Sequence, residues 1–178
     1  MRFWATALLV FWPTLLSSGP IELIGNGLGH ACAVEGRVFT ARHVVEDFQT
    51  GKTYTHRSNY GKMRIVKIHR DRDLAEISLE QKPPSWPLAK SITPGEKVLW
   101  WEYNFNNRRD TGKVNMRDAR VIRISADHIF FDRQPIPGAS GTCLANEKGE
   151  VVGIVFRFFQ TGAGMAVSLV GTAWPPER

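Results

Sequence analysis

The chain has 178 residues, of which 43% are hydrophobic and 22% charged, a composition that fits a folded protein and excludes extended disorder. This length suits either one domain or two small lobes that share an interface. The formal net charge of +6, from 23 Lys and Arg against 17 Asp and Glu, favours anionic partners but identifies no function.

The first 19 residues have the three-part pattern of a secretory signal. Arg2 precedes an apolar run from Phe3 to Leu16, and small residues follow at positions 17–19. The run is shorter than the about 20 apolar residues of a membrane span, and Pro13 interrupts it. We expect a signal peptide or membrane anchor over 1–19, and a secreted, periplasmic or membrane-anchored protein, with a buried amphipathic start as the alternative.

Beyond residue 19 the chain consists of short β-rich runs separated by turn residues, and no run has a clean helical period. Strands this numerous must each bury one face against another sheet, so we expect an all-β fold. The predicted strands are 31–34, 37–41, 63–69, 74–79, 97–102, 119–125, 128–132, 151–158 and 164–169.

A proline-rich stretch interrupts the strand pattern between positions 81 and 94. It contains Pro83, Pro84 and Pro87, and proline cannot donate to a strand ladder, so the stretch is typical of a linker. We therefore expect two β-rich lobes, residues 20–85 and residues 86–178.

Three short motifs carry residues suited to nucleophilic catalysis, in the chain order His, Asp, Ser. His43 follows the predicted strand 37–41, Asp73 lies at the start of the predicted strand 74–79, and Ser140 lies in a tight turn flanked by Gly138 and Gly141. A serine hydroxyl becomes nucleophilic when an imidazole takes its proton, and a carboxylate must hold that imidazole in the right tautomer. Glycine adopts backbone angles closed to other residues, so the N–H groups of Gly138 and Ser140 can point together at an oxyanion.

These motifs resemble those of the trypsin-like serine peptidases, and among them the protease domain of the HtrA/DegP type. The resemblance covers nearly the whole chain after the leader, through residues 27–29, 40–45, 73–75, 87–89, 94–98, 132, 137–141 and 149–154. It implies two six-stranded antiparallel Greek-key β-barrels of the chymotrypsin type, with the active site between them. It also implies a serine endopeptidase that cleaves protein or peptide substrates through an acyl-enzyme intermediate, with His43, Asp73 and Ser140 as catalytic triad and Gly138 and Ser140 as oxyanion hole.

Two features depart from the HtrA pattern. Thr142 and Cys143 stand where that family usually has a second glycine and a proline, which broadens the resemblance to viral chymotrypsin-like proteases. No PDZ module follows Ser140, so we do not expect the regulated oligomeric behaviour of complete HtrA proteins.

Other residues compete for these roles. Asp71 lies two positions before Asp73 on the same face of an extended segment, but the Leu-Ala that follows Asp73 favours Asp73, which leaves Asp71 and Asp47 as solvated acids. Cys143 is a conceivable thiol nucleophile, yet the nucleophile position holds Ser140, and Cys143 lies three residues further on, in the next expected strand. It is expected instead as a core residue or as the partner of Cys32, and the pairing is left open.

By the same resemblance, Gln134, Val155, Phe156 and Arg157 lie near the first specificity pocket. Gln134 has no charge, which disfavours a trypsin-like preference for basic side chains. Phe156 would narrow the pocket toward small or medium apolar side chains, whereas Arg157 or Arg133 would attract acidic ones, and the sequence does not choose between them.

The second hypothesis is a catalytically inactive, protease-like binding module that recognises an anionic partner through the basic stretch at residues 108–123. A solvated strand-and-loop face explains that stretch as well, and we expect no nucleic-acid partner. We expect no cofactor and no metal, because no CxxC or HxxxH spacing accompanies the two cysteines. Membrane association would involve the apolar segment within residues 1–19.

Overall fold

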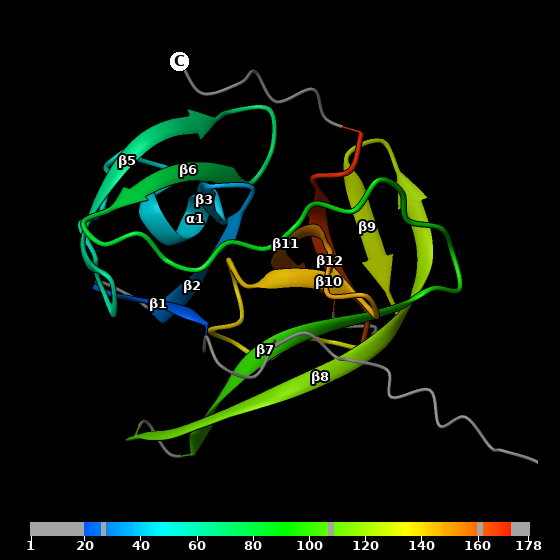
Figure 1. The fold of residues 1–178 in the computed structure, drawn as a ribbon. Coiled ribbons are helices and arrows are strands. Elements are labelled where there is room, and N and C mark those ends of the chain that lie inside the picture. The colour runs from blue at the N-terminus through cyan, green and yellow to red at the C-terminus, as the bar shows by residue number, and fades with distance from the viewer. Residues whose placement is uncertain (1–19, 26–27, 107–108, 160–161, 172–178) are drawn as a thin grey trace, which may run out of the picture.

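The computed structural model in Figure 1 describes residues 20–25, 28–106, 109–159 and 162–171. The leader predicted over residues 1–19 lies outside them and stays a prediction. Within the described part of the chain, no helix has the length and apolar character needed to cross a membrane.

The first barrel occupies the left of Figure 1, and its strands close in the order β1-β2-β3-β6-β5-β4 with antiparallel neighbours. Glu35 and Gly36 join β2 to β3 with φ angles of 48° and 81°, the pair of positive values that a type I′ hairpin turn requires. Its elements are β1 (Ile21–Ile24), β2 (Leu28–Val34), β3 (Arg37–Thr40), α1 (Arg42–Val45), β4 (Arg57–Ser58), β5 (Gly61–His69) and β6 (Leu74–Leu79).

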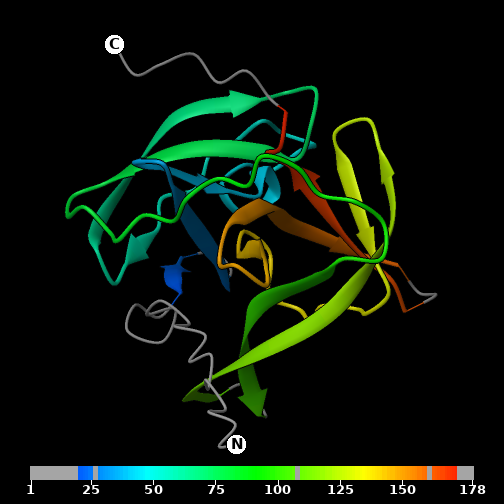
Figure 2. The ribbon, with the colours of Figure 1, turned by 45° about the vertical axis from the view of Figure 1, so that its right-hand side comes forward.

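The second barrel closes in the order β10-β11-β12-β9-β8-β7, also with antiparallel neighbours. Figures 1 and 2 show that β7 and β8 form a long two-stranded ribbon that extends away from the rest of the barrel. The strands are β7 (Lys97–Asn106), β8 (Arg109–Ser125), β9 (His128–Phe131), β10 (Cys143–Asn146), β11 (Val151–Phe158) and β12 (Gly164–Ser168).

The expected all-β fold of two six-stranded antiparallel barrels is thus confirmed. The strand expected at Cys143 is β10, whereas β1 and β4 are not among the predicted strands, and β8 begins at Arg109 rather than at residue 119. The segment 109–118 is mostly polar and contains Gly112, so its composition does not favour a strand. This segment is a strand because it pairs with β7 along its length, and not because its composition favours a strand.

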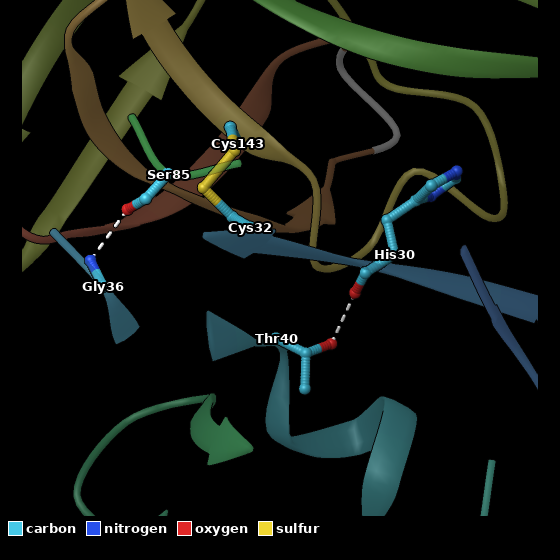
Figure 3. Close-up of a disulfide and its surroundings, with 6 residues drawn as sticks. All are labelled: His30, Cys32, Gly36, Thr40, Ser85 and Cys143. Atoms are coloured by element: carbon cyan, nitrogen blue, oxygen red, sulfur yellow. Dashed lines mark hydrogen bonds between the residues drawn. A yellow bond between two sulfur atoms is a disulfide. The ribbon is translucent and has the colours of Figure 1, made fainter. Parts of the chain in front are cut away.

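The proline-rich connection between the barrels is hydrogen-bonded to both of them. The N–H of Trp86 donates to the carbonyl of Ala33 over 2.9 Å, and the N–H of Val151 donates to the carbonyl of Pro87 over 2.8 Å. The hydroxyl of Ser85 accepts from the N–H of Gly36 over 2.7 Å (Figure 3). The connection therefore lies first beside β2 of the first barrel and then beside β11 of the second barrel.

Three apolar clusters stabilise this arrangement, one inside each barrel and one shared by both. The shared cluster brings together Phe39 and Leu74 from the first barrel with Ile154 and Val167 from the second. A disulfide between Cys32 in β2 and Cys143 in β10 crosses the same interface, with a Cα–Cα distance of 5.0 Å (Figure 3). The two barrels are thus covalently linked close to the turn that carries Ser140.

Candidate active site

His43 lies in α1, directly after β3, and Asp73 holds it at two points. One carboxylate oxygen of Asp73 accepts the backbone N–H of His43 over 2.9 Å, and the other lies 2.7 Å from Nδ1 of the ring. The side chain of Asp73 is only 14% exposed, whereas that of His43 is 38% exposed. The imidazole is therefore oriented by a largely buried carboxylate and faces the open side of the site.

Ser140 comes from the second barrel, in the loop between β9 and β10, and its Oγ lies 2.9 Å from Nε2 of His43. A carboxylate can only accept at Nδ1, so the proton of the neutral ring belongs on Nδ1 and Nε2 can accept from the hydroxyl. The geometry thus forms a chain Asp73–His43–Ser140 across the two barrels.

The turn around Ser140 is held by both barrels. The N–H of Gly141 donates to the carbonyl of Val155 over 2.7 Å, and the carbonyl of Ser140 accepts from the N–H of His30 over 2.8 Å. Gly141 has a φ of +89°, and a Cβ added there would lie 1.9 Å from the carbonyl oxygen of His30. Only glycine satisfies both the backbone angle and the close approach at this position.

Gly138 lies in a second tight turn, which precedes the serine. The N–H of Ala139 donates to the carbonyl of Ile136 over 3.1 Å, with Pro137 and Gly138 between them, and Gly138 has a φ of +95°. Proline followed by a glycine with positive φ is the signature of a type II turn. Among the hydrogen bonds between described residues, the N–H groups of Gly138 and Ser140 donate to no acceptor, so both can bind an incoming oxygen.

The structure brings Asp73, and not Asp71, to His43. The side chain of Asp71 is 64% exposed and pairs with Arg72 over 2.9 Å. Asp47 accepts the N–H groups of Gln49 and Thr50 over 2.8 and 3.0 Å in its own loop. Both of these acids therefore have local partners away from the imidazole.

A cavity of about 260 Å³ opens beside the proposed nucleophile. Of the residues predicted near the specificity pocket, Val155, Phe156 and Arg157 line this cavity, whereas Gln134 is exposed and is not one of the lining residues. The full lining consists of His43, Pro135, Ile136, Pro137, Ala139, Ser140, Val155, Phe156 and Arg157.

Sequence reasoning missed the wall of this cavity that Pro135, Ile136 and Pro137 form. It also missed Phe48, a residue that is 53% exposed and whose ring lies 6.5 Å from the imidazole of His43, centroid to centroid. An exposed aromatic residue shortly after a candidate catalytic histidine was the available signal for Phe48. No comparable signal identified the proline wall, because its position depends on the loop conformation.

The described part of the basic stretch is engaged within the protein. Arg117 pairs with Glu102 over 2.9 Å, the guanidinium of Arg120 donates to the carbonyl of Gly95, and Arg123 lies over the ring of Phe130. The structure does not describe the other basic side chains of this stretch, at positions 108, 109 and 113. These contacts match the interpretation of a structural strand face.

Cys143 is disulfide-bonded and so presents no thiol to a substrate. Across residues 20–171, apart from the undescribed positions, no cluster of three or more His, Cys, Asp or Glu side chains could hold a metal ion.

Comparisons with known proteins identify the family and the fold of the chain. The family profile described as trypsin-like peptidase domain matches residues 27–154. The chain is 27% identical over 166 residues to HhoB from Synechocystis sp., a protein named provisionally as a serine protease. That match covers 82% of this chain but 38% of HhoB, so the chain spans about two-fifths of the relative's length.

Two solved structures show the likeness of the fold. A Glu endopeptidase superposes with a TM-score of 0.68 at 14% identity, covering 88% of this chain and 87% of the other. The HtrA-type protease AlgW superposes with a TM-score of 0.62 at 21% identity, covering 79% of this chain and 48% of the other. Both the chymotrypsin-like fold and the distant similarity to HtrA-type proteins are therefore confirmed.

Proposed function

Because the chain belongs to the trypsin-like peptidase domain family, whose profile covers residues 27–154, we propose that it is a serine endopeptidase with His43, Asp73 and Ser140 as its catalytic triad. The observation that carries this proposal is the placement of the His43 ring, with Nδ1 2.7 Å from Asp73 and Nε2 2.9 Å from Ser140. These are the donor and acceptor contacts that activate a serine hydroxyl.

In the proposed reaction, Nε2 of His43 takes the proton of Ser140 while Oγ attacks the carbonyl carbon of the substrate. The N–H groups of Gly138 and Ser140 donate to the negative oxygen that forms. The imidazolium, stabilised by Asp73, then returns its proton to the departing amine, and an ester to Ser140 remains. Water activated by the same imidazole hydrolyses that ester and restores the serine.

We expect a fluorophosphonate probe to label the folded protein, and Ser140→Ala to abolish the labelling, since the probe phosphonylates only an activated serine. Intact-mass spectrometry measures the mass added. Ser91→Ala, a change at an exposed serine of the connection between the barrels, is the matched control and should label fully. A folded wild-type protein that gains no mass would end the proposal.

We further propose that the cavity beside Ser140 accepts an acidic side chain. Among its lining residues only His43 and Arg157 carry a side chain that can be cationic, and none carries a carboxylate. Arg157 is exposed and forms no ion pair with a described carboxylate, whereas Arg133, the other candidate, pairs with Asp118 over 3.2 Å and does not line the cavity. The likeness to a Glu endopeptidase concerns the fold alone, because the two chains are only 14% identical. The proposed preference for acidic side chains therefore rests on the charge of Arg157.

The acidic preference is tested with two peptides that differ only in glutamate or glutamine on the amino side of the cleaved bond. The wild type should cleave the glutamate peptide with about tenfold higher kcat/KM, the effect of one charge-assisted hydrogen bond of ~1.5 kcal/mol. Arg157→Met should remove the difference, and Arg133→Met should keep it. Equal cleavage by the wild type would count against the assignment without affecting the triad.

We do not propose the inactive binding module. The described arginines of the basic stretch have partners within the protein, and the N–H groups of Gly138 and Ser140 donate to no described acceptor. Active-site chemistry accounts for the second observation, and a surface for anionic partners does not.

A further inference from the structure

His30 connects the first barrel to the turn that precedes the proposed nucleophile. It lies in β2, is 2% exposed, and its Nδ1 is 2.7 Å from the carbonyl oxygen of Gly138 in the second barrel. The two residues are 108 positions apart in the chain. A buried imidazole from one barrel therefore contacts the glycine whose N–H donates to no acceptor among the described residues.

The protonation of the His30 ring determines which atom donates in its hydrogen bond with Gly138. Burial lowers the pKa of His30 to about 4, although the bond to Gly138 acts in the opposite sense, so the ring is neutral at pH 7. A carbonyl oxygen can only accept a hydrogen bond, so the proton of the neutral ring is on Nδ1. His30 thus donates to Gly138.

This bond completes the restraint of one peptide group. The N–H of the peptide between Gly138 and Ala139 donates to Ile136, and its carbonyl accepts from His30. The peptide is planar, so these two bonds fix its orientation. The two proposed oxyanion donors belong to the neighbouring peptides: the N–H of Gly138 to the peptide before it, and the N–H of Ser140 to the peptide after it. The angle between these two N–H groups therefore depends on the orientation of the peptide between Gly138 and Ala139.

The backbone of His30 is itself anchored. Its N–H donates to the carbonyl of Ser140 over 2.8 Å, and its carbonyl accepts from the hydroxyl of Thr40 over 2.6 Å (Figure 3). Two residues further along β2, Cys32 is bonded to Cys143. The imidazole is therefore carried by a strand whose backbone is hydrogen-bonded to Ser140 and Thr40.

We infer that His30 is a positioning residue, whose imidazole holds the Gly138–Ala139 peptide so that the N–H groups of Gly138 and Ser140 converge on one oxygen. The inference rests on the proposed serine peptidase function. It assigns to His30 no contact with the substrate. Its effect is on the transition state, because the oxyanion forms only there.

The test compares His30→Asn with His30→Leu, two side chains of similar shape. The amide nitrogen of asparagine can take the place of Nδ1 and donate to Gly138, whereas leucine cannot. With active sites titrated by fluorophosphonate, we expect His30→Leu to lower kcat about 100-fold with little change in KM, as for a small misplacement of catalytic groups. His30→Asn should remain within a few-fold of the wild type.

A merely structural role predicts a different result, with both variants equally destabilised and kcat per active site unchanged. That result would overturn the inference while leaving the triad in place. A wild type that does not react with the probe would overturn the proposed function and this inference with it.

A measurement on the wild type covers the case in which His30→Leu does not fold. At neutral pH, ¹⁵N spectra of the imidazole groups should show His30 protonated on Nδ1, with its signal assigned by its loss in His30→Asn. A proton on Nε2 and a bare Nδ1 would overturn the inference, because no bond to the Gly138 carbonyl could then form.

Discussion

Asp73→Asn is expected to lower kcat by about 10⁴-fold while the fold stays intact. The amide oxygen of asparagine can still accept the backbone N–H of His43, which Asp73 now accepts over 2.9 Å. Its NH₂ group would then face Nδ1 of the ring and favour the tautomer with the proton on Nε2. That tautomer cannot take a proton from Ser140.

The matched control is Asp71→Asn, two positions away, where the exposed carboxylate pairs with Arg72. This variant should keep kcat within about twofold, because surface ion pairs contribute little. Peptide hydrolysis gives kcat for both variants, and circular dichroism reports the fold. A large loss in Asp71→Asn together with a small loss in Asp73→Asn would reverse the assignment of the acid.

The second large effect is on stability. The double variant Cys32→Ala/Cys143→Ala is expected to lose about 2–4 kcal/mol in the free energy of unfolding. The disulfide closes a loop between residues 111 positions apart, and so restricts the unfolded chain strongly. Urea denaturation followed by tryptophan fluorescence measures the loss.

Removal of two sulfur atoms also leaves space in the core, since Cys32 is fully buried. Reduction of the wild type separates this contribution from that of the covalent bond. Dithiothreitol should destabilise the wild type and leave the double variant unchanged. Equal unfolding midpoints for oxidised and reduced wild type would show that the bond contributes nothing.

Much of the fold and of the candidate site could be predicted from local patterns. The short β-rich runs between turn residues indicated most strands, and the sequence Pro137-Gly138 already contains the residue types of a type II turn. Strand β4 and the extension of β8 could not be predicted this way, because β4 has only two residues and residues 109–118 are mostly polar. Pairing makes both of them strands, β4 with β1 and β5, and the extension of β8 with β7.

From local patterns alone one obtains the all-β class, the division into two β-rich lobes, and His43, Asp73 and Ser140 as candidates for a triad. The folded chain adds that Cys32 is bonded to Cys143, that Arg157 rather than Arg133 lines the cavity, and that the ring of His30 reaches Gly138. Two of these contacts are hidden from the sequence by their separation along the chain. The contacts of His30 with Gly138 and of Cys32 with Cys143 join residues 108 and 111 positions apart, and they exist only once the two barrels have packed together.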